Sequence, residues 1–421
     1  MNRTIWTVIA LILLAGCTTA GPKKISPTIV STPKQAVQTL VIPTETAFPP
    51  TATLAPTWTP VPTATKPPIP AKGYGPTAFP PDIDPLTGLQ VSDPQLLNRR
   101  PVVVKVENLP REHRPQAGLS LADVVYEYYT EEGTTRFAAV YYGQDAERVG
   151  PIRSGRFFDI NVVQMYKGIF IFGSAYTDVW NRFVSSDFGN RLILENEFSC
   201  PAVCRYDKTG QNILTANTKE VNGYLVKAGI NNGRQNLDGT LFLPGMAAGG
   251  QPAAQVYTRF SGAIYNRWDY DATSGRYVRF EETKNDINRV DEAYAQLIDK
   301  LTGQPVAADN LITLCIPHSY YRKTAETEVV DILPLPASGA VTSCDGKNYP
   351  GGSGPAYAAR DGQIYTLTWK RQLKTDLITL WNADGTQFAL KPGQTWYEVM
   401  GASSTIEIKG NMWHFLFKIV P

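Results

Sequence analysis

Two arginines, Arg153 and Arg156, stand three residues apart in the stretch RVGPIRSGRFFDI at residues 148–160. A Gly-Pro pair precedes them, and an amphipathic run typical of a helix begins at Phe157. The first turn of a helix leaves backbone N–H groups unpaired, and the macrodipole adds partial positive charge there. A guanidinium group adds a planar fork that suits carboxylate or phosphate. With Ser154, whose hydroxyl can donate a hydrogen bond, the arginines predict an anion site.

Cations at the start of a helix are unfavourable by a few tenths to about 1 kcal/mol, so a negative charge must compensate these arginines. The first alternative is an internal carboxylate that braces the fold. Four acidic residues are candidates for that role: Asp123, Glu127, Glu132 and Asp159. The second alternative is a bound anionic ligand, and the third is exposure to solvent. The residues alone leave all three open.

A β-hairpin predicted at residues 122–143 decides which charged groups join the arginines, and its strands flank Glu131-Glu132-Gly133. A two-residue turn at 132–133 would place Tyr129 opposite Arg136. Glu127 would then lie diagonally across on the same face, which favours a structural Glu127–Arg136 pair. A three-residue turn would send Glu127 and Arg136 to opposite faces and free Arg136 to join the other arginines. The candidate ligand-binding residues are Glu127, Tyr129, Arg136, Arg153, Ser154 and Arg156.

The body around these residues alternates between strand and helix patterns before about residue 245 and is rich in short strands after it. In the first half we expect a strand at 101–108, the hairpin, a helix at 157–168, a strand at 169–175, and helices at 176–186 and 218–230. In the second half, alternating apolar runs are separated by Gly, Asp, Asn or Pro. These patterns predict both helices and strands in the first half and mainly strands in the second.

The first seventeen residues, MNRTIWTVIALILLAGC, predict the compartment. An apolar run from Ile5 to Ala15 follows one cation, Arg3, and is too short to span a bilayer as a mature helix. It ends in Leu-Ala-Gly-Cys, the pattern of a bacterial lipobox, which predicts cleavage before Cys17 and lipidation of that residue. Residues 1–17 are therefore interpreted as a lipoprotein signal peptide. The chain is expected outside the cytoplasm, anchored to the outer face of the cell membrane.

Residues 18–78 have the composition of a linker, since 17 of the 28 residues at 43–70 are Pro or Thr. Proline fixes φ and lacks an amide proton, so neither helix nor sheet can run through such a segment. It also has too few large apolar residues to offset chain entropy. We predict a disordered stalk that extends by about 3.1 Å per residue where it adopts polyproline II.

Four further cysteines form an even set, which predicts disulfides in an oxidising compartment: Cys200, Cys204, Cys315 and Cys344. Three connectivities are open, and spacing favours the local one, 200 with 204 and 315 with 344. Only three histidines exist and none lies beside a cysteine, so no metal site is predicted. No cofactor is predicted, because the Gly-rich stretch 349–362 lacks the Lys-Ser/Thr of a phosphate loop. A net charge of +2 argues against nucleic acid as the main partner.

Five ordered blocks resemble the YerB-like family of bacterial lipoproteins, a domain of unknown function. They are DPLTGL, RRPVVVKVEN, HRPQAGLSLADVVYEYYTEEGTTRFAAVYY, GPIRSGRFF and LKPGQTWYEVM, spread from residue 84 to residue 400. The resemblance implies a mixed α/β body in a layered sandwich. Its N-terminal α/β part would cover residues 79–245, and its strand-rich C-terminal part residues 246–421. The family supplies no established activity.

The sequence lacks a recognisable set of catalytic residues, so an enzyme is the less favoured interpretation. We expect a lipid-anchored extracytoplasmic binding or envelope-maintenance protein, with a cell-wall polymer or another anion or glycan as its ligand. The alternative is an envelope-polymer enzyme that acts on a phosphorylated, lipid-linked substrate. For that alternative, the arginine-bearing turn before a helix broadly resembles the wall-polymer transferases of the LytR-CpsA-Psr family, whose arginines hold a lipid pyrophosphate.

Overall fold

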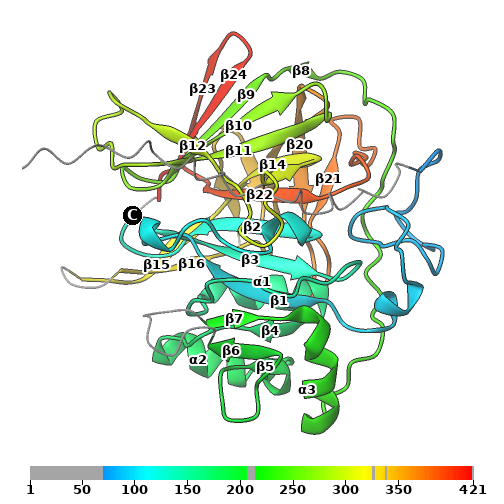
Figure 1. Ribbon diagram of the computed structural model, residues 1–421. Coiled ribbons are helices and arrows are strands. Elements are labelled where there is room, and N and C mark those ends of the chain that lie inside the picture. The colour runs from blue at the N-terminus through cyan, green and yellow to red at the C-terminus, as the bar shows by residue number, and fades with distance from the viewer. Residues whose placement is uncertain (1–69, 206–213, 325–327, 337–338, 420–421) are drawn as a thin grey trace, which may run out of the picture. The chain divides into compact units, whose positions relative to one another are not determined.

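The computed structural model describes residues 70–205, 214–324, 328–336 and 339–419 (Figure 1). The predicted signal peptide, Cys17 and the predicted stalk as far as residue 69 lie outside these ranges. Within them the fold is strand-rich with few helices, which confirms the mixed α+β class in its coarse form. None of the helices described here combines the length and the apolar character that crossing a bilayer requires.

An eleven-stranded sheet contains strands from both halves of the sequence. In spatial order it runs β21–β20–β19–β14–β22–β2–β3–β1–β4–β5, and β8 pairs with β20. The strands from the first half are β1 (Val102–Glu107), β2 (Val124–Tyr129), β3 (Thr135–Tyr141), β4 (Ile169–Ile171) and β5 (Leu192–Ile193). Those from the second half are β8 (Gln251–Pro252), β14 (Asn310–Ile316), β19 (Ser353–Arg360), β20 (Gln363–Lys370), β21 (Thr379–Trp381) and β22 (Thr395–Gly401). The direct pairing of β2 with β22 joins the two halves.

A seven-stranded sheet comes entirely from the second half of the chain. Its order is β12–β11–β10–β9–β24–β23, with β13 paired to β11. The bounds are β9 (Gln255–Arg259), β10 (Tyr265–Asp271), β11 (Arg276–Glu282), β12 (Tyr294–Gln296), β13 (Ala307–Ala308), β23 (Thr405–Lys409) and β24 (Met412–Leu416). A hairpin turn at residues 272–275 joins β10 to β11, where position 271 pairs with position 276.

Short elements complete the fold. Three two-stranded ribbons are β6 (Val203–Arg205) with β7 (Leu214–Ala216), β15 (His318–Lys323) with β16 (Glu328–Ile332), and β17 (Ala340–Thr342) with β18 (Asn348–Pro350). The α-helices are α1 (Phe157–Tyr166), α2 (Thr177–Val184) and α3 (Val221–Ala228). The 3-10 turns are η1 (Pro94–Asn98), η2 (Arg111–His113), η3 (Leu119–Leu121), η4 (Gly189–Arg191) and η5 (Thr218–Glu220).

The large sheet is covered on both faces near β2, which explains why β1, β2 and β22 are buried along their whole length. On one face, Phe158 of α1 packs its ring against Tyr128 at a centroid distance of 4.8 Å. On the other face, Trp396 of β22 meets Trp268 of the seven-stranded sheet at 5.1 Å. Figure 1 shows the smaller sheet above the large one and the α-helices below it.

Two predictions, the end of the stalk and the disulfide connectivity, can be compared with the structure. Tyr74, within the range predicted as stalk, exchanges backbone hydrogen bonds of 3.0 and 2.8 Å with Phe242 and so pairs with the body. The disulfides join Cys200 to Cys204 and Cys315 to Cys344, which is the local connectivity.

Of the two hairpin turns that the sequence left open, the two-residue turn is wrong, and Glu127 and Arg136 lie on opposite faces as expected for a three-residue turn. Tyr129 pairs with Thr135 and Tyr128 with Arg136, so the connection spans residues 130–134. Glu127 pairs with Phe137 and therefore faces the opposite side of the sheet from Arg136. The cause lies in the turn: the Thr130 amide bonds to the Thr134 carbonyl at 2.9 Å, which encloses three residues instead of two.

Candidate functional site

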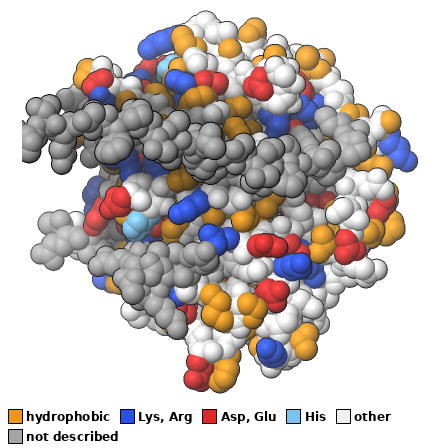
Figure 2. All heavy atoms as spheres, in the orientation of Figure 1, with side chains coloured by type: hydrophobic (Ala, Val, Ile, Leu, Met, Phe, Trp, Pro, Cys, Tyr) orange, Lys and Arg blue, Asp and Glu red, His pale blue; other side chains and the backbone are white. Residues whose placement is uncertain are grey.

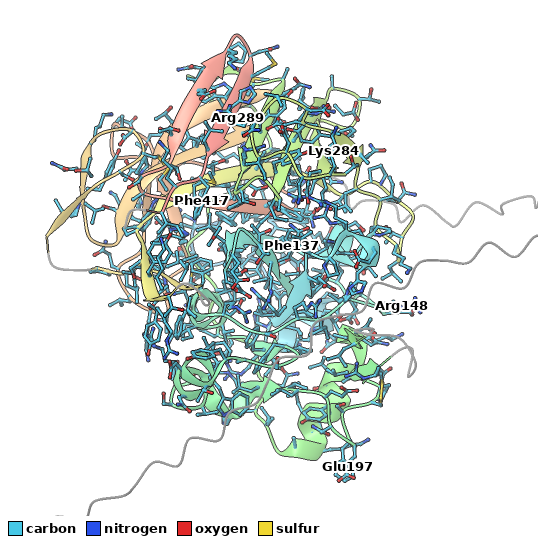
Figure 3. The ribbon with its side chains drawn as sticks, turned by 90° about the vertical axis from the view of Figure 1, so that its left-hand side faces the viewer. Phe137, Arg148, Glu197, Lys284, Arg289 and Phe417 are labelled. Carbon is cyan, nitrogen blue, oxygen red and sulfur yellow. A yellow bond between two sulfur atoms is a disulfide. The ribbon has the colours of Figure 1, made fainter. Side chains whose placement is uncertain are left out.

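The candidate arginines gather at one edge of the large sheet. Strands β1, β4 and β5 are parallel, as are β2, β22 and β14, and both β1 and β2 are antiparallel to β3. All six strands therefore end at the same edge, which lies on the left in Figure 1 and faces the reader in Figure 3. In open α/β sheets, ligands bind outside the carboxyl ends of such strands.

Arg136 and Arg156 converge on the carboxylate of Glu131 at this edge. Arg136, at the start of β3, donates from Nη2 to Glu131 Oε1 at 2.8 Å. Arg156, directly before α1, donates from Nε to Glu131 Oε2 at 2.5 Å and from Nη2 to Oε1. The side chains of Arg136, Glu131 and Arg156 keep 16%, 21% and 17% of their surface exposed, so solvent reaches the group.

The charges of this group do not balance, since two guanidinium groups share one carboxylate. Burial, and then the neighbouring Arg156, lowers the pKa of Arg136 to about 10. Burial alone would raise the pKa of Glu131, but its bonds to Arg156 and the charge of Arg136 lower that pKa below its ordinary value. Arg136 Nη1 also donates to the Ser154 carbonyl at 2.8 Å, which fixes the guanidinium plane against the loop before α1.

Arg153 lies in a separate ion pair at the same edge. Its Nε donates to Glu107 Oε1 at 2.7 Å, and His113 Nδ1 lies 3.1 Å from Glu107 Oε2. Glu107 ends β1 and is 2% exposed, and burial raises the pKa of its carboxyl although Arg153 and His113 oppose the shift. In Figure 2, basic, acidic and histidine side chains lie together at the left-hand margin, at the height of β2 and β3.

A buried lysine lies beneath the arginines. Lys105 Nζ lies 3.2 Å from Asp159 Oδ1, and it also donates to the Tyr128 hydroxyl, which in turn donates to the same carboxylate oxygen. Asp159 Oδ2 accepts from the Arg156 amide at 2.6 Å, which ties the start of α1 to the buried pair. Burial, opposed by Asp159 and assisted by the charges of Arg136 and Arg156, lowers the pKa of Lys105 to about 7.

A second loop and an aromatic stack adjoin the start of α1. Ser154 and Ser174 place their hydroxyls 2.7 Å apart, and Ser174 belongs to the loop between β4 and α2. Beside them, Arg182 of α2 lies over the ring of Phe157 at 4.1 Å and over that of Tyr321 at 5.1 Å. Tyr321 is 43% exposed, so this stack borders the arginine site with an accessible aromatic ring.

Glu127 and Tyr129 lie on the other face of the sheet, away from the arginines. Glu127 Oε2 accepts from Arg279 Nη2 at 2.6 Å, and Arg279 Nη1 also donates to Glu398 at 3.1 Å. All three side chains are buried between the two sheets. Burial lowers the pKa of Arg279, but Glu127, Glu281 and Glu398 outweigh it and raise that pKa. Tyr129 stacks on Phe417 at 4.8 Å.

Two family models match the chain, one after the other. Residues 86–231 match the N-terminal domain of a protein of unknown function (DUF3048), and residues 256–397 match its C-terminal domain. Together the matched residues make up more than half of the chain. The chain belongs to the DUF3048 family. The resemblance to YerB-like proteins that its sequence blocks predict is thereby confirmed.

One relative of this DUF3048 chain bears the name "Putative lipoprotein YerB" and comes from Bacillus subtilis (strain 168). The two are 26% identical over 333 residues, which cover 75% of this chain and 85% of the relative. The crystal structure of the YerB protein from Bacillus subtilis matches with a TM-score of 0.57 at 21% identity. The match covers 76% of this chain and 97% of that one, and it shows a shared fold.

For this DUF3048 protein, the carboxylates that compensate the arginines differ from those expected. Asp123 instead accepts the amides of Tyr142 and Gly143, and Glu127 binds Arg279. The two that pair with the arginines are Glu131 and Glu107, which hydrophobic patterning could not select. Lys105 was also missed, although a single lysine inside the β-branched run VVVKVE is a detectable signal for a buried charge.

Proposed function

We propose that this chain is a lipid-anchored extracytoplasmic protein whose body binds an anionic group at Arg136 and Arg156. The observation that carries the proposal is the convergence of two partly exposed guanidinium groups on one carboxylate. The excess positive charge, the place at the carboxyl ends of β1, β2 and β4, and the adjoining start of α1 support it. The role is binding within the cell envelope, with a cell-wall polymer as the candidate ligand.

The anchor is supported by the lipobox ending in Cys17 and by the name of the relative from Bacillus subtilis. The Pro/Thr-rich residues 18–69 would let the body reach about 160 Å from the membrane at 3.1 Å per residue, which favours a ligand in the wall over one at the bilayer surface. Cells fed a labelled fatty acid should incorporate it into the full chain, Cys17→Ser should abolish the incorporation, and Thr18→Ser should leave it unchanged. Labelling of the Cys17 variant at the wild-type level would contradict the anchor.

Binding is tested by titrating the full chain with inorganic phosphate in an isothermal calorimeter. The double variant Arg136→Gln/Arg156→Gln should weaken phosphate binding at least about tenfold, because each charge-assisted hydrogen bond contributes about 1.5–3 kcal/mol. Arg289→Gln is the control, since that arginine also pairs with one carboxylate, Glu407 of the other sheet, but lies outside the candidate site. Equal affinity of the double variant and the wild type, with both folded, would remove the proposal.

A further inference from the structure

Glu131 occupies the place that an anionic ligand would need. Its two carboxylate oxygens accept from Arg136 and from both Nε and Nη2 of Arg156. This fork-to-carboxylate geometry is the one with which arginine also holds phosphate. An anion that binds to the arginine pair must therefore displace the Glu131 side chain first.

The turn that carries Glu131 is fixed to the body. The Gly133 amide donates to the Tyr129 hydroxyl at 2.8 Å, and Ser261 Oγ donates to the Gly133 carbonyl at 2.6 Å. Glu131 is thus presented to the arginines intramolecularly, at an effective concentration above the millimolar range of short flexible tethers. A free carboxylate would make the same contacts without that advantage, so it cannot compete at ordinary concentrations.

A more highly charged ligand has an advantage that the tethered carboxylate lacks. The arginine pair retains one positive charge after Glu131 is counted, and the Coulomb attraction of a dianion to each guanidinium is twice that of a monoanion. The Glu131 side chain is 21% exposed and lies at a hairpin turn, so it can rotate into solvent without moving a strand. Charge therefore selects which anions gain access.

We propose that Glu131 is a built-in competitor that reserves the arginine pair for dianionic phosphate-type groups and excludes simple carboxylates. The inference rests on the proposed function, because it assumes that Arg136 and Arg156 bind a ligand. The ligand class is a phosphomonoester-type dianion, and Glu131 is the residue that determines the specificity.

The test compares Glu131→Gln with Glu132→Gln, which makes the same change at the next, exposed position. The full chain is titrated with inorganic phosphate and, separately, with acetate at constant ionic strength. Wild type and Glu132→Gln should bind phosphate and show no acetate binding. Glu131→Gln should bind phosphate at least about tenfold more tightly and make acetate binding measurable. Glycerol 3-phosphate, and phosphatidylcholine vesicles with and without phosphatidic acid, then separate soluble from lipid-linked phosphate.

Two outcomes distinguish a failure of the Glu131 inference from a failure of the proposed function. If Glu131→Gln binds phosphate no better than wild type while Arg136→Gln/Arg156→Gln loses it, competition by Glu131 is wrong and the proposed function stands. If wild type and Glu131→Gln both fail to bind phosphate, the proposed function falls with it. Should Glu131→Gln not fold, the wild type alone decides: sulfate must bind at least about tenfold more tightly than nitrate, and equal affinity overturns the inference.

Discussion

Lys105 Nζ lies 3.2 Å from Asp159 Oδ1, and neither side chain has exposed surface. Lys105 comes from the middle of β1 and Asp159 from the first turn of α1, so the pair joins the sheet to the helix that begins at the arginine site. Asp159 also accepts a hydrogen bond from the Arg156 amide. A change in the charge of Lys105 therefore changes the electrostatic potential where an anion would bind.

Anion affinity should fall as the pH rises through the pKa of Lys105. That pKa is lowered to about 7, mainly by burial and in part by the charges of Arg136 and Arg156. A bound anion would offset the repulsion from these arginines and favour the ammonium form, so binding takes up protons above pH 7. Sulfate, whose charge is constant in this range, should bind several-fold more weakly at pH 9 than at pH 6 in calorimetric titrations.

Lys105→Met provides the control for this pH dependence. It replaces the buried amine by an apolar side chain of similar length and leaves Asp159 bonded to Tyr128 and Arg156. The variant should bind sulfate with nearly the same affinity at both pH values. A slope that persists in the variant would assign the pH dependence to a group other than Lys105.

Glu398→Gln should change the pH dependence of stability. Burial, and then the neighbouring Glu127, raises the pKa of Glu398 to about 8, although Arg279 opposes the shift. Between the ordinary value near 4.5 and pH 8, the folded chain holds a proton that the unfolded chain releases, so the free energy of unfolding falls as the pH rises. Glutamine has no ionisable proton, so the free energy of unfolding of the variant does not fall with pH for this reason.

Urea unfolding at pH 5 and pH 9 measures the difference. The variant should be close to wild type at pH 5 and more stable at pH 9, by an amount on the order of a few kcal/mol. Glu112→Gln, an exposed position, should show no such gain. If Glu398→Gln gains nothing between the two pH values, the carboxyl is ionised throughout and its high pKa is wrong.

The two disulfides should contribute unequally to stability. Cys315 and Cys344 are separated by 29 positions, whereas Cys200 and Cys204 are separated by only 4. Closing the longer loop restricts the unfolded chain more, so replacing that pair by serine should cost about 3 to 4 kcal/mol, against about 2 kcal/mol for the shorter loop. Chemical unfolding of the two double-serine variants tests this order, and the reverse order would contradict it.

Local elements were predictable because they depend on short-range patterns. The helix expected from Phe157 begins at that residue, and the strands expected at 101–108 and 169–175 contain β1 and β4. Helix α1 ends at Tyr166. The next residue, Lys167, adopts a left-handed φ of 50° directly before Gly168. Each of these features follows from neighbouring residues alone.

Long-range partners were not predictable in the same way. The pairing of β2 with β22 joins residues about 270 positions apart, and neither strand's pattern identifies the other. Whether Arg136 pairs with Glu127 or joins Arg156 depended on one residue of hairpin register, which the sequence left open, and the register in the structure places both arginines on Glu131. A slip of one position reverses every side chain of a strand, so the site could be located but its ion pairs could not.

If Arg136 and Arg156 bind an anion in place of Glu131, the side-chain Nε–H resonances of these arginines should shift when the anion binds. Heteronuclear NMR spectra of the full chain, assigned with single Arg→Lys variants, are recorded while sulfate is added. We expect saturable shifts for Arg156 and Arg136 and none for Arg289. Resonances of Arg156 and Arg136 that stay fixed up to high sulfate, like that of Arg289, would contradict it.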